Sequence, residues 1–374
     1  MSSAFAAIAS ASGLVREATP FPASVCDLIS VYAAASGAEE LLRAATMADP
    51  APLRNLLQPS ARGDVLGAFR PACRRGDQRL ALWLAARFGL TAAEARGDNN
   101  FALRAACSNG HLATAQWLAS HFGLTAADAR AQDNFALSRA CSKGHLATAQ
   151  WLAAHFGLAP ADARASGNHA LRSACEGGHL ATAQWLAARF GLEAADARAR
   201  ALHDACEGGH LATAQWLAEH FGLTPADARA TDNIALRWTC SNGHLAVAQW
   251  LATHFGLTPD DARAVGNFAL RFACTGGHLA TAQWLAAHFG LSPADARAGA
   301  NFALRCACAN GHLATAQWLA AHFGLTPADA RANDNEALRQ AYEGYHLATA
   351  RWLLAHFGLT AADAGKYAAR TRPP

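Results

Sequence analysis

Histidine and cysteine are the residues of this chain best suited to chemistry, because both bind zinc and together they can act as nucleophile and base. The chain has 17 histidines and ten cysteines, most of them at fixed spacing. Eight histidines lie in a Gly-His-Leu step or a close variant of it: His111, His145, His179, His210, His244, His278, His312 and His346. Seven more precede Phe-Gly: His121, His155, His220, His254, His288, His322 and His356. Eight cysteines share another position: Cys73, Cys107, Cys141, Cys175, Cys206, Cys240, Cys274 and Cys308.

The spacing argues against a metal or catalytic site. His111 and His121 are ten residues apart, about 15 Å along a helix, whereas zinc ligands lie about 2 Å from the metal. Each unit presents the same cysteine and histidine without a distinctive partner, and no phosphate loop, Gly-x-Ser-x-Gly, His-Glu-x-x-His or Cys-x-x-Cys motif occurs. We therefore predict no catalytic, cofactor-binding or metal-binding residue, and we expect the histidines to bond backbone groups between helices.

The cysteines are predicted to be unpaired. Equivalent residues in neighbouring units would lie about 8–10 Å apart if helices pack on one another, which is beyond the reach of a disulfide. Free buried cysteine behaves as a small hydrophobe. A reducing compartment follows from this interpretation, and we expect a cytoplasmic protein.

The repetition itself predicts the architecture. A unit of 34 residues recurs, with one step of 31, and its tryptophans mark nine copies: Trp83, Trp117, Trp151, Trp185, Trp216, Trp250, Trp284, Trp318 and Trp352. A fixed period of this size is typical of a solenoid, in which each unit buries its apolar face only against its neighbours. We therefore expect one repeat array with a core that grows along its length.

Each unit contains the signals for three helices. An asparagine opens the first helix and is predicted to be its N-cap, at Asn100, Asn134, Asn168, Asn233, Asn267, Asn301 and Asn335. The helix runs for about two turns to a glycine such as Gly110. Leu112, Ala115, Leu118 and Phe122 then form the apolar stripe of a second helix. Thr125-Ala126-Ala127-Asp128 is a capping box, which predicts a third helix of one turn.

The stretch Ala-Leu-Arg-x-Ala-Cys-x-x-Gly-His-Leu resembles the ankyrin repeat over about residues 64–364. The resemblance implies an all-α, ankyrin-like solenoid of about nine stacked helix-turn-helix repeats that binds proteins. The sequence departs from the family where Phe101-Ala102 replaces Thr-Pro, and where Leu-Thr-x-x-Asp-Ala-Arg replaces the usual hairpin loop. The tetratricopeptide repeat shares the period, but its Trp-x-x-Leu-Gly-x-x-Tyr pattern does not occur.

We divide the chain into an N-terminal helical cap or docking segment (residues 1–60), the repeat array (61–365) and a tail (366–374). The segment from Phe21 to Tyr32 resembles the first helix of an F-box, which implies docking onto a ubiquitin ligase. A second interpretation of the N-terminus is a transit peptide, because residues 1–15 are rich in serine and alanine and contain no acidic residue.

The composition makes nucleic-acid and membrane partners unexpected. The net charge is only +3, and no apolar run reaches the roughly 18 residues of a membrane-spanning helix. Arginines do recur on the short turn: Arg96, Arg130, Arg164, Arg198, Arg229, Arg263, Arg297 and Arg331. A row of cations could follow a phosphate backbone, but each follows an acidic residue by two positions. We expect these arginines to bond carbonyls and aspartates between units.

Function is predicted where the units differ. One position after the first-helix arginine varies most, and its occupants include the predicted partner-binding residues Arg139, Ser173, Asp204, Trp238, Phe272 and Gln340. The ankyrin resemblance implies that this position faces a concave binding groove, and adjacent aromatics there are typical of an interface hot spot. Alternatively, they fill gaps between units.

The sequence thus predicts a monomeric, non-enzymatic scaffold that binds a protein partner and needs no cofactor. The alternative is the substrate-receptor adaptor of a ubiquitin ligase. The unit around Ala199 lacks three residues and its asparagine, and we expect the curvature of the solenoid to break there.

Overall fold

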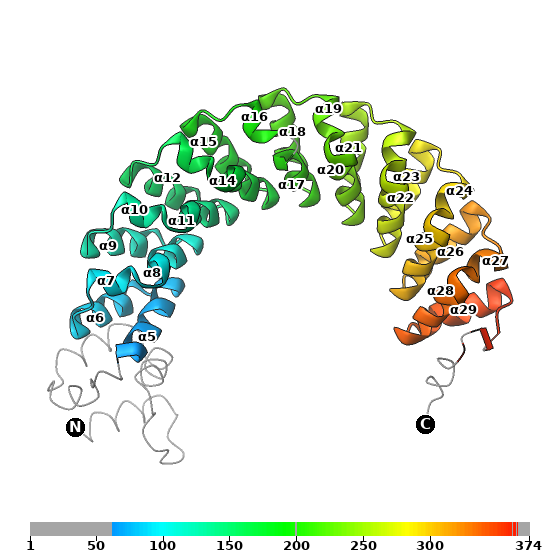
Figure 1. Cartoon of the computed structure of the whole chain (residues 1–374), viewed down its shortest axis with the longest axis horizontal. Coiled ribbons are helices and arrows are strands. Elements are labelled where there is room, and N and C mark those ends of the chain that lie inside the picture. The colour runs from blue at the N-terminus through cyan, green and yellow to red at the C-terminus, as the bar shows by residue number, and fades with distance from the viewer. Residues whose placement is uncertain (1–61, 199, 361, 364, 366–374) are drawn as a thin grey trace, which may run out of the picture. The chain divides into compact units, whose positions relative to one another are not determined.

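The computed structural model describes residues 62–198, 200–360, 362, 363 and 365 (Figure 1). Over these residues the chain forms helices and no strand, as predicted, and it falls into two compact units, Met1–Ser166 and Gly167–Pro374. No helix in this part of the chain is long and apolar enough to cross a bilayer. The F-box-like segment and the transit-peptide-like residues lie outside the described residues.

Each repeat contributes two main helices. The first helices are α5 (Arg62–Arg75), α8 (Gly97–Ser108), α11 (Ala131–Ser142), α14 (Ala165–Glu176), α17 (Arg200–Glu207), α20 (Ala230–Ser241), α22 (Pro259–Thr275), α25 (Ala298–Ala309) and α28 (Ala332–Glu343). The second helices are α6 (Gln78–Phe88), α9 (Leu112–Phe122), α12 (Leu146–His155), α15 (Leu180–Phe190), α18 (Leu211–Phe221), α21 (Leu245–Phe255), α23 (Leu279–Phe289), α26 (Leu313–Phe323) and α29 (Leu347–Phe357). The predicted repeat number is thus confirmed over the described range.

A helix of one turn precedes most first helices. These short helices are α7 (Ala92–Ala95), α10 (Ala126–Ala129), α13 (Pro160–Ala163), α16 (Ala194–Ala197), α19 (Pro225–Ala228), α24 (Pro293–Ala296) and α27 (Pro327–Ala330). The predicted capping box is present, since the Asp128 carboxylate accepts from the Thr125 N–H at 2.7 Å and from its hydroxyl at 3.0 Å. In the repeat that contains Thr258, the short helix runs into the first helix, and α22 contains both.

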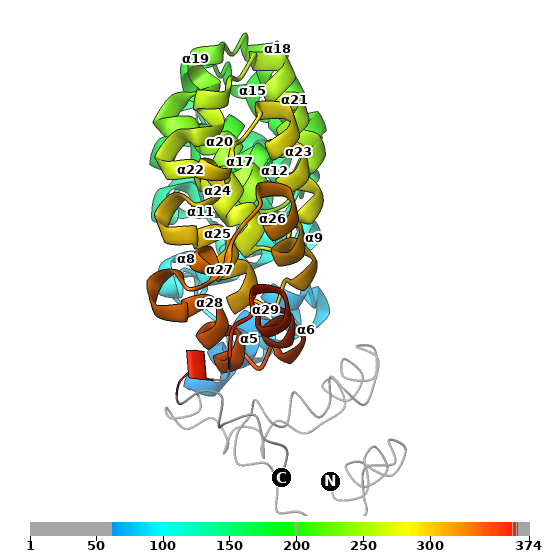
Figure 2. The same ribbon diagram turned by 90° about the vertical axis from the view of Figure 1, so that its right-hand side faces the viewer.

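Helices of the same kind stack on one another within each unit. In the first unit α8 contacts α5 and α11, and in the second unit α22 contacts α20 and α25. Figure 2 shows α22, α25 and α28 along one side of the second unit and α23, α26 and α29 along the other. The first helices therefore form one continuous face of the second unit, on its concave side in Figure 1.

The core consists of small and medium-sized side chains that recur in every repeat. Leu137, Cys141 and Leu152, for example, are at most 1% exposed. Burying one leucine contributes about 1.5–3 kcal/mol, whereas isolated helices of this length are marginal in water. Stacking between repeats therefore supplies the stability that one repeat lacks.

The asparagine that recurs in the repeats does not cap the first helix, so that prediction was wrong. In α8 the three residues Asp98, Asn99 and Asn100 have φ of 52°, 54° and 60°, which places one left-handed turn before the regular helix begins at Phe101. The buried Oδ1 of Asn100 has no hydrogen-bond partner among the described residues, and neither do its six counterparts. Asparagine tolerates the left-handed region better than most residues. In these repeats it adopts that conformation and does not act as an N-cap.

The shortened repeat, which contains α17, omits the left-handed turn. Arg198 leaves the helical region, with φ −53° and ψ 138°, and α17 begins two residues later at Arg200. The three missing residues therefore correspond to the left-handed turn, and α17 still packs against α20. Thr239 Oγ1 in α20 donates to the Cys206 carbonyl at 3.1 Å, which ties the short unit to the next one.

The Gly-His step joins successive repeats. Gly110 ends its helix at φ +74°, and a Cβ built on it would lie 2.6 Å from His145 Nδ1 of the next repeat. In the repeat before, the His111 ring nitrogen Nε2 bonds the Arg74 carbonyl at 3.1 Å. The predicted backbone-bonding role of these histidines is confirmed at His111, and the glycine is needed because the imidazole packs directly on it.

Substituting Gly110→Ala should destabilise the array more than Gly123→Ala. Both positions have positive φ, which costs about 1 kcal/mol for alanine, but a Cβ at Gly123 meets nothing within 4 Å. The clash with His145 adds about 1–3 kcal/mol to the cost at Gly110. Urea denaturation followed by circular dichroism measures both values, and equal losses for the two variants would contradict the packing role.

Candidate functional site

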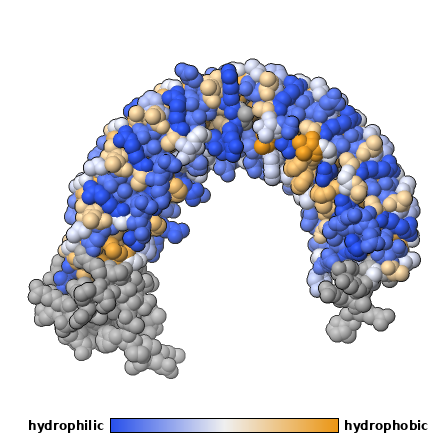
Figure 3. Space-filling model, viewed as in Figure 1, coloured by the Kyte–Doolittle hydropathy of each residue, from blue (hydrophilic) through white to orange (hydrophobic). Residues whose placement is uncertain are grey.

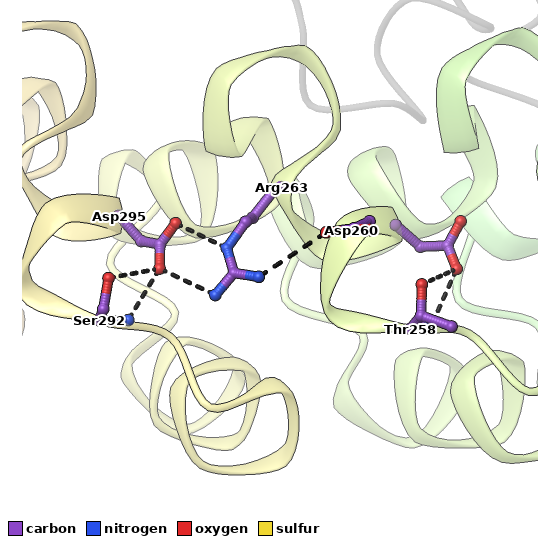
Figure 4. A network of polar contacts seen from close by, with 6 residues as sticks. Thr258, Asp260, Arg263, Ser292 and Asp295 are labelled. Carbon is purple, nitrogen blue, oxygen red and sulfur yellow. Dashed lines mark hydrogen bonds and ion pairs between the residues drawn. The ribbon is translucent and has the colours of Figure 1, made fainter.

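The turn arginines and the capping-box aspartates form a ladder between repeats. Arg263 Nε donates to Asp295 Oδ1 at 2.9 Å and Nη2 to Oδ2 at 3.2 Å (Figure 4). Asp295 also accepts from the N–H and hydroxyl of Ser292, at 2.8 and 2.9 Å. Equivalent ion pairs join Arg96 to Asp128, Arg130 to Asp162, Arg229 to Asp261, and Arg297 to Asp329. In Arg96 and Arg229, Nε alone donates to both carboxylate oxygens. The arginine-to-aspartate network predicted from the sequence is thus confirmed.

Four first-helix arginines, Arg104, Arg237, Arg271 and Arg305, bond carbonyls of the left-handed turn instead. Arg104 donates from Nε to the Asn99 carbonyl at 2.7 Å and from Nη2 to the Asp98 carbonyl at 2.8 Å. Arg305 bonds the carbonyls of Ala300 and Gly299 in the same way, at 2.8 and 3.0 Å. These arginines satisfy carbonyls that the change of helical hand leaves without partners.

The histidines before Phe-Gly stack on the repeat's own tryptophan. The rings of Trp117 and His121 lie 5.2 Å apart with an interplanar angle of 21°. Equivalent stacks join His155, His220, His254, His288, His322 and His356 to tryptophan in their repeats. These histidines therefore pack at the ends of the second helices and do not converge on a common point.

The cysteine ladder is buried and unpaired in the described chain. Burial raises the pKa of Cys73 to about 12, and it also raises the pKa values of Cys107, Cys141 and Cys240. The thiols remain protonated at neutral pH and are poor nucleophiles. They act as small apolar side chains in the core.

One group of potential metal ligands does come together, in the short unit. Atoms of His203, Asp204 and Glu207 lie within 4.8 Å of one another, and His203 Nε2 is 3.2 Å from Glu207 Oε2. The Asp204 carboxylate, however, already accepts from Arg172 Nε at 2.8 Å. A metal ion here would compete with that guanidinium, so we interpret the group as an ion-pair network that holds α17 to α14.

The variable position of the first helix has different environments in different repeats. Trp238 is 37% exposed, while Arg139, Phe272 and Gln340 are half-buried. Ser173 and Asp204 are buried, the first 3.3 Å from His169 Nδ1 and the second bonded to Arg172. Four of the six predicted residues thus reach the surface, and two face neighbouring side chains.

Two aromatic residues join Trp238 and Phe272 to form what we call the aromatic cluster: Trp238, Phe268, Phe272 and Phe302. Ring centroids are 5.8 Å apart for Trp238 and Phe268, 3.9 Å for Phe268 and Phe272, and 5.6 Å for Phe272 and Phe302. Figure 3 shows apolar surface over the part of the second unit where Figure 1 labels α20 and α22. The exposed residues in these helices include Trp238 and Val265.

Sequence reasoning did not identify Phe268 and Phe302 as site residues. They occupy the constant Asn-Phe-Ala-Leu position, which predicts core packing, yet both remain half-buried. Arginines lie over their rings, with the Arg237 guanidinium carbon 5.0 Å from the Phe268 centroid and that of Arg271 4.1 Å from the Phe302 centroid. The useful signal was the distance of four residues between Phe268 and Phe272, which places both on one helix face.

Comparison with protein-family models finds ankyrin repeats in two parts of the chain. Residues 202–297 match a family model of three ankyrin repeats, and residues 137–187 match a second family model, which describes many copies of the ankyrin repeat. No curated protein matches the chain. The first match covers the aromatic residues Trp238, Phe268 and Phe272.

The ladder should make stability fall in acid. Burial favours a higher pKa for Asp329, but the Arg297 guanidinium and the N–H and hydroxyl of Thr326 outweigh it and lower that pKa to about 2. Because the unfolded value is higher, near 3.9, the stabilisation is complete above about pH 5 and is lost as the pH falls towards 2. Asp329→Asn should cost about 2 kcal/mol near neutral pH and little near pH 2.

Asp260→Asn provides the control for this experiment. Asp260 has a side chain that is 97% exposed and lies 3.9 Å from Arg263 Nη1 (Figure 4). Exposed pairs of this kind contribute about 0–1 kcal/mol. Urea denaturation of both variants over the acid range tests the ladder, and parallel pH profiles for the two would refute its role.

Proposed function

Because the chain is an ankyrin repeat protein, we propose that it binds a protein partner through the first-helix face of its second unit, centred on the aromatic cluster. The observation that carries this proposal is the partial exposure of four connected aromatic rings on that face. A fully structural role would place such rings in the core, where each repeat already buries leucine and phenylalanine. Connected, half-buried aromatics supported by arginine are typical of interface hot spots.

The proposed mechanism is binding to a surface that is already rigid. Phe268 and Phe272 stack within α22, and Trp238 and Phe302 contact them from the neighbouring helices α20 and α25. The rings therefore lose little side-chain entropy when a partner covers them, and pre-organisation of this kind raises affinity. Nothing in the proposed role requires a catalytic group or a cofactor.

Substituting Trp238→Ala/Phe272→Ala should abolish capture of a specific partner from cell lysate. Removing two hot-spot aromatics costs about 2–4 kcal/mol of binding free energy each, which is enough to reduce recovery by more than tenfold. Mass spectrometry of captured proteins measures the effect. Gln283→Ala/Gln317→Ala is the matched control, because both glutamines are exposed on the second helices α23 and α26.

Circular dichroism must show that the two variants are equally helical. If Trp238→Ala/Phe272→Ala then recovers the same proteins as the original chain, the aromatic cluster is a packing feature and the proposal is wrong. Gln340, another predicted residue, occupies the variable position of α28 in the second unit and is the next substitution to make on this face. Arg139 occupies that position in α11 of the first unit.

The ubiquitin-ligase adaptor is a further prediction, and it depends on Phe21–Tyr32, outside the described residues. Deleting residues 1–60 separates the two functions. Partner capture through the aromatic cluster should survive the deletion, whereas an adaptor would lose a ligase component on the same truncation. Retention of every captured protein after the deletion would leave the adaptor hypothesis without support.

A further inference from the structure

The first unit has a hollow where the second unit has aromatic side chains. A cavity of about 700 Å³ opens on the first-helix face between α5, α8 and α11. Its lining includes Ala105 and Arg139, which occupy the same variable position as Trp238 and Phe272. The small Ala105 side chain leaves space that an aromatic residue fills elsewhere, so the sequence at one position decides between a pocket and an apolar surface.

The charged residues that line this pocket are all positive. Four of its lining residues are the cations Arg74, Arg104, Arg139 and Lys143, and no aspartate or glutamate is among the described residues that line it. Asp98 is the acidic residue whose charge interacts with Arg104, and it also forms an ion pair with Arg70. The described lining of the cavity therefore carries positive charge without a carboxylate of its own.

The guanidinium groups are held close together around an aromatic ring. The guanidinium carbons of Arg104 and Arg139 lie 5.0 and 5.6 Å from the Phe135 centroid. Arg104 is fixed by the carbonyls of the left-handed turn. Two like charges over one ring, with no carboxylate among the described lining residues, form a site that an anion would complete.

We propose that this pocket binds an acidic segment of a partner protein, in which carboxylates lie beside an apolar side chain. The inference rests on the proposed function and names the chemistry of a second contact region. The carboxylates would accept from Arg139 and Lys143, and the apolar side chain would pack on Phe101, which also lines the cavity. The volume lies within the range of about 300–1,000 Å³ that is typical of ligand pockets, so it accommodates a few side chains of such a segment.

A nucleic acid fits the pocket less well than a peptide does. Single-stranded nucleic acids need aromatic faces for base stacking as well as cations. The guanidinium groups already lie over Phe135, and the cations in the lining converge on one cavity instead of following a line. Carboxylates at the end of short side chains match this arrangement better than a phosphate backbone.

Binding of a fluorescent acidic peptide, Glu-Glu-Leu-Phe-Glu-Glu, to the full chain tests the proposal by fluorescence anisotropy. Arg139→Gln/Lys143→Gln should weaken binding at least about tenfold, because it removes charge-assisted hydrogen bonds. Arg75→Gln/Arg351→Gln removes the same charge from exposed positions outside the pocket and should leave binding within about twofold. Ala105→Phe should also abolish binding, because it fills the cavity without changing any charge.

Three results would overturn the proposal. Equal affinities for the pocket and control variants would show that overall positive charge holds the peptide. Undiminished binding to Ala105→Phe, with helicity unchanged, would place the peptide elsewhere. Tighter, pocket-dependent binding of a thymidine oligonucleotide than of the peptide would assign the site to nucleic acid.

The proposed function is tested separately by the same assay. The aromatic-cluster variant Trp238→Ala/Phe272→Ala leaves the first unit unchanged and should bind the acidic peptide as the original chain does. Loss of the lysate partner with retention of the peptide would support two distinct contact regions. Retention of the lysate partner by the aromatic-cluster variant, together with loss of the peptide by the pocket variants, would support the pocket and contradict the proposed role of the aromatic cluster.

Discussion

A capping-box carboxylate makes two kinds of contact in five of the described repeats, through Asp128, Asp162, Asp261, Asp295 and Asp329. Asp295 Oδ2 accepts from the N–H and the hydroxyl of Ser292, and this capping box starts the short helix α24. Both carboxylate oxygens of Asp295 also accept from the guanidinium of Arg263 in the repeat before. Local helix initiation and contact between repeats therefore depend on the same side chain. Because the carboxylate is largely buried and fully bonded, removing either partner leaves an unsatisfied charge, which is more costly than the loss of an exposed ion pair.

A second contact joins successive repeats, because the imidazole of His145 packs on Gly110. Within a repeat, the carbonyls of the left-handed turn accept from Arg104. The repeated histidines, cysteines and turn arginines therefore make structural contacts in the described chain. The position at which the repeats differ is part of the face that we propose for binding.

The variable position of the first helix gives the first-helix face a different character in each unit. In the second unit Trp238 and Phe272 fill it, and with Phe268 and Phe302 they form an apolar surface. In the first unit Ala105 leaves a basic cavity beside Arg139. The first-helix face is thus apolar around the aromatic cluster of the second unit and cationic around the pocket of the first unit, and few residues account for the difference.

The sequence by itself determined the repeat, the second helix, the capping box and the arginine network, because each depends on interactions between residues at fixed spacing. It also identified Trp238 and Phe272 as candidates, since variation against a constant background is visible in one chain. It did not determine the conformation of the asparagine, which favours both caps and left-handed turns, and only the tertiary structure decided between them. The burial of Asp204, the exposure of Phe268 and the cavity beside Ala105 were likewise decided by packing between repeats, because they depend on which side chain the neighbouring helix places opposite each position.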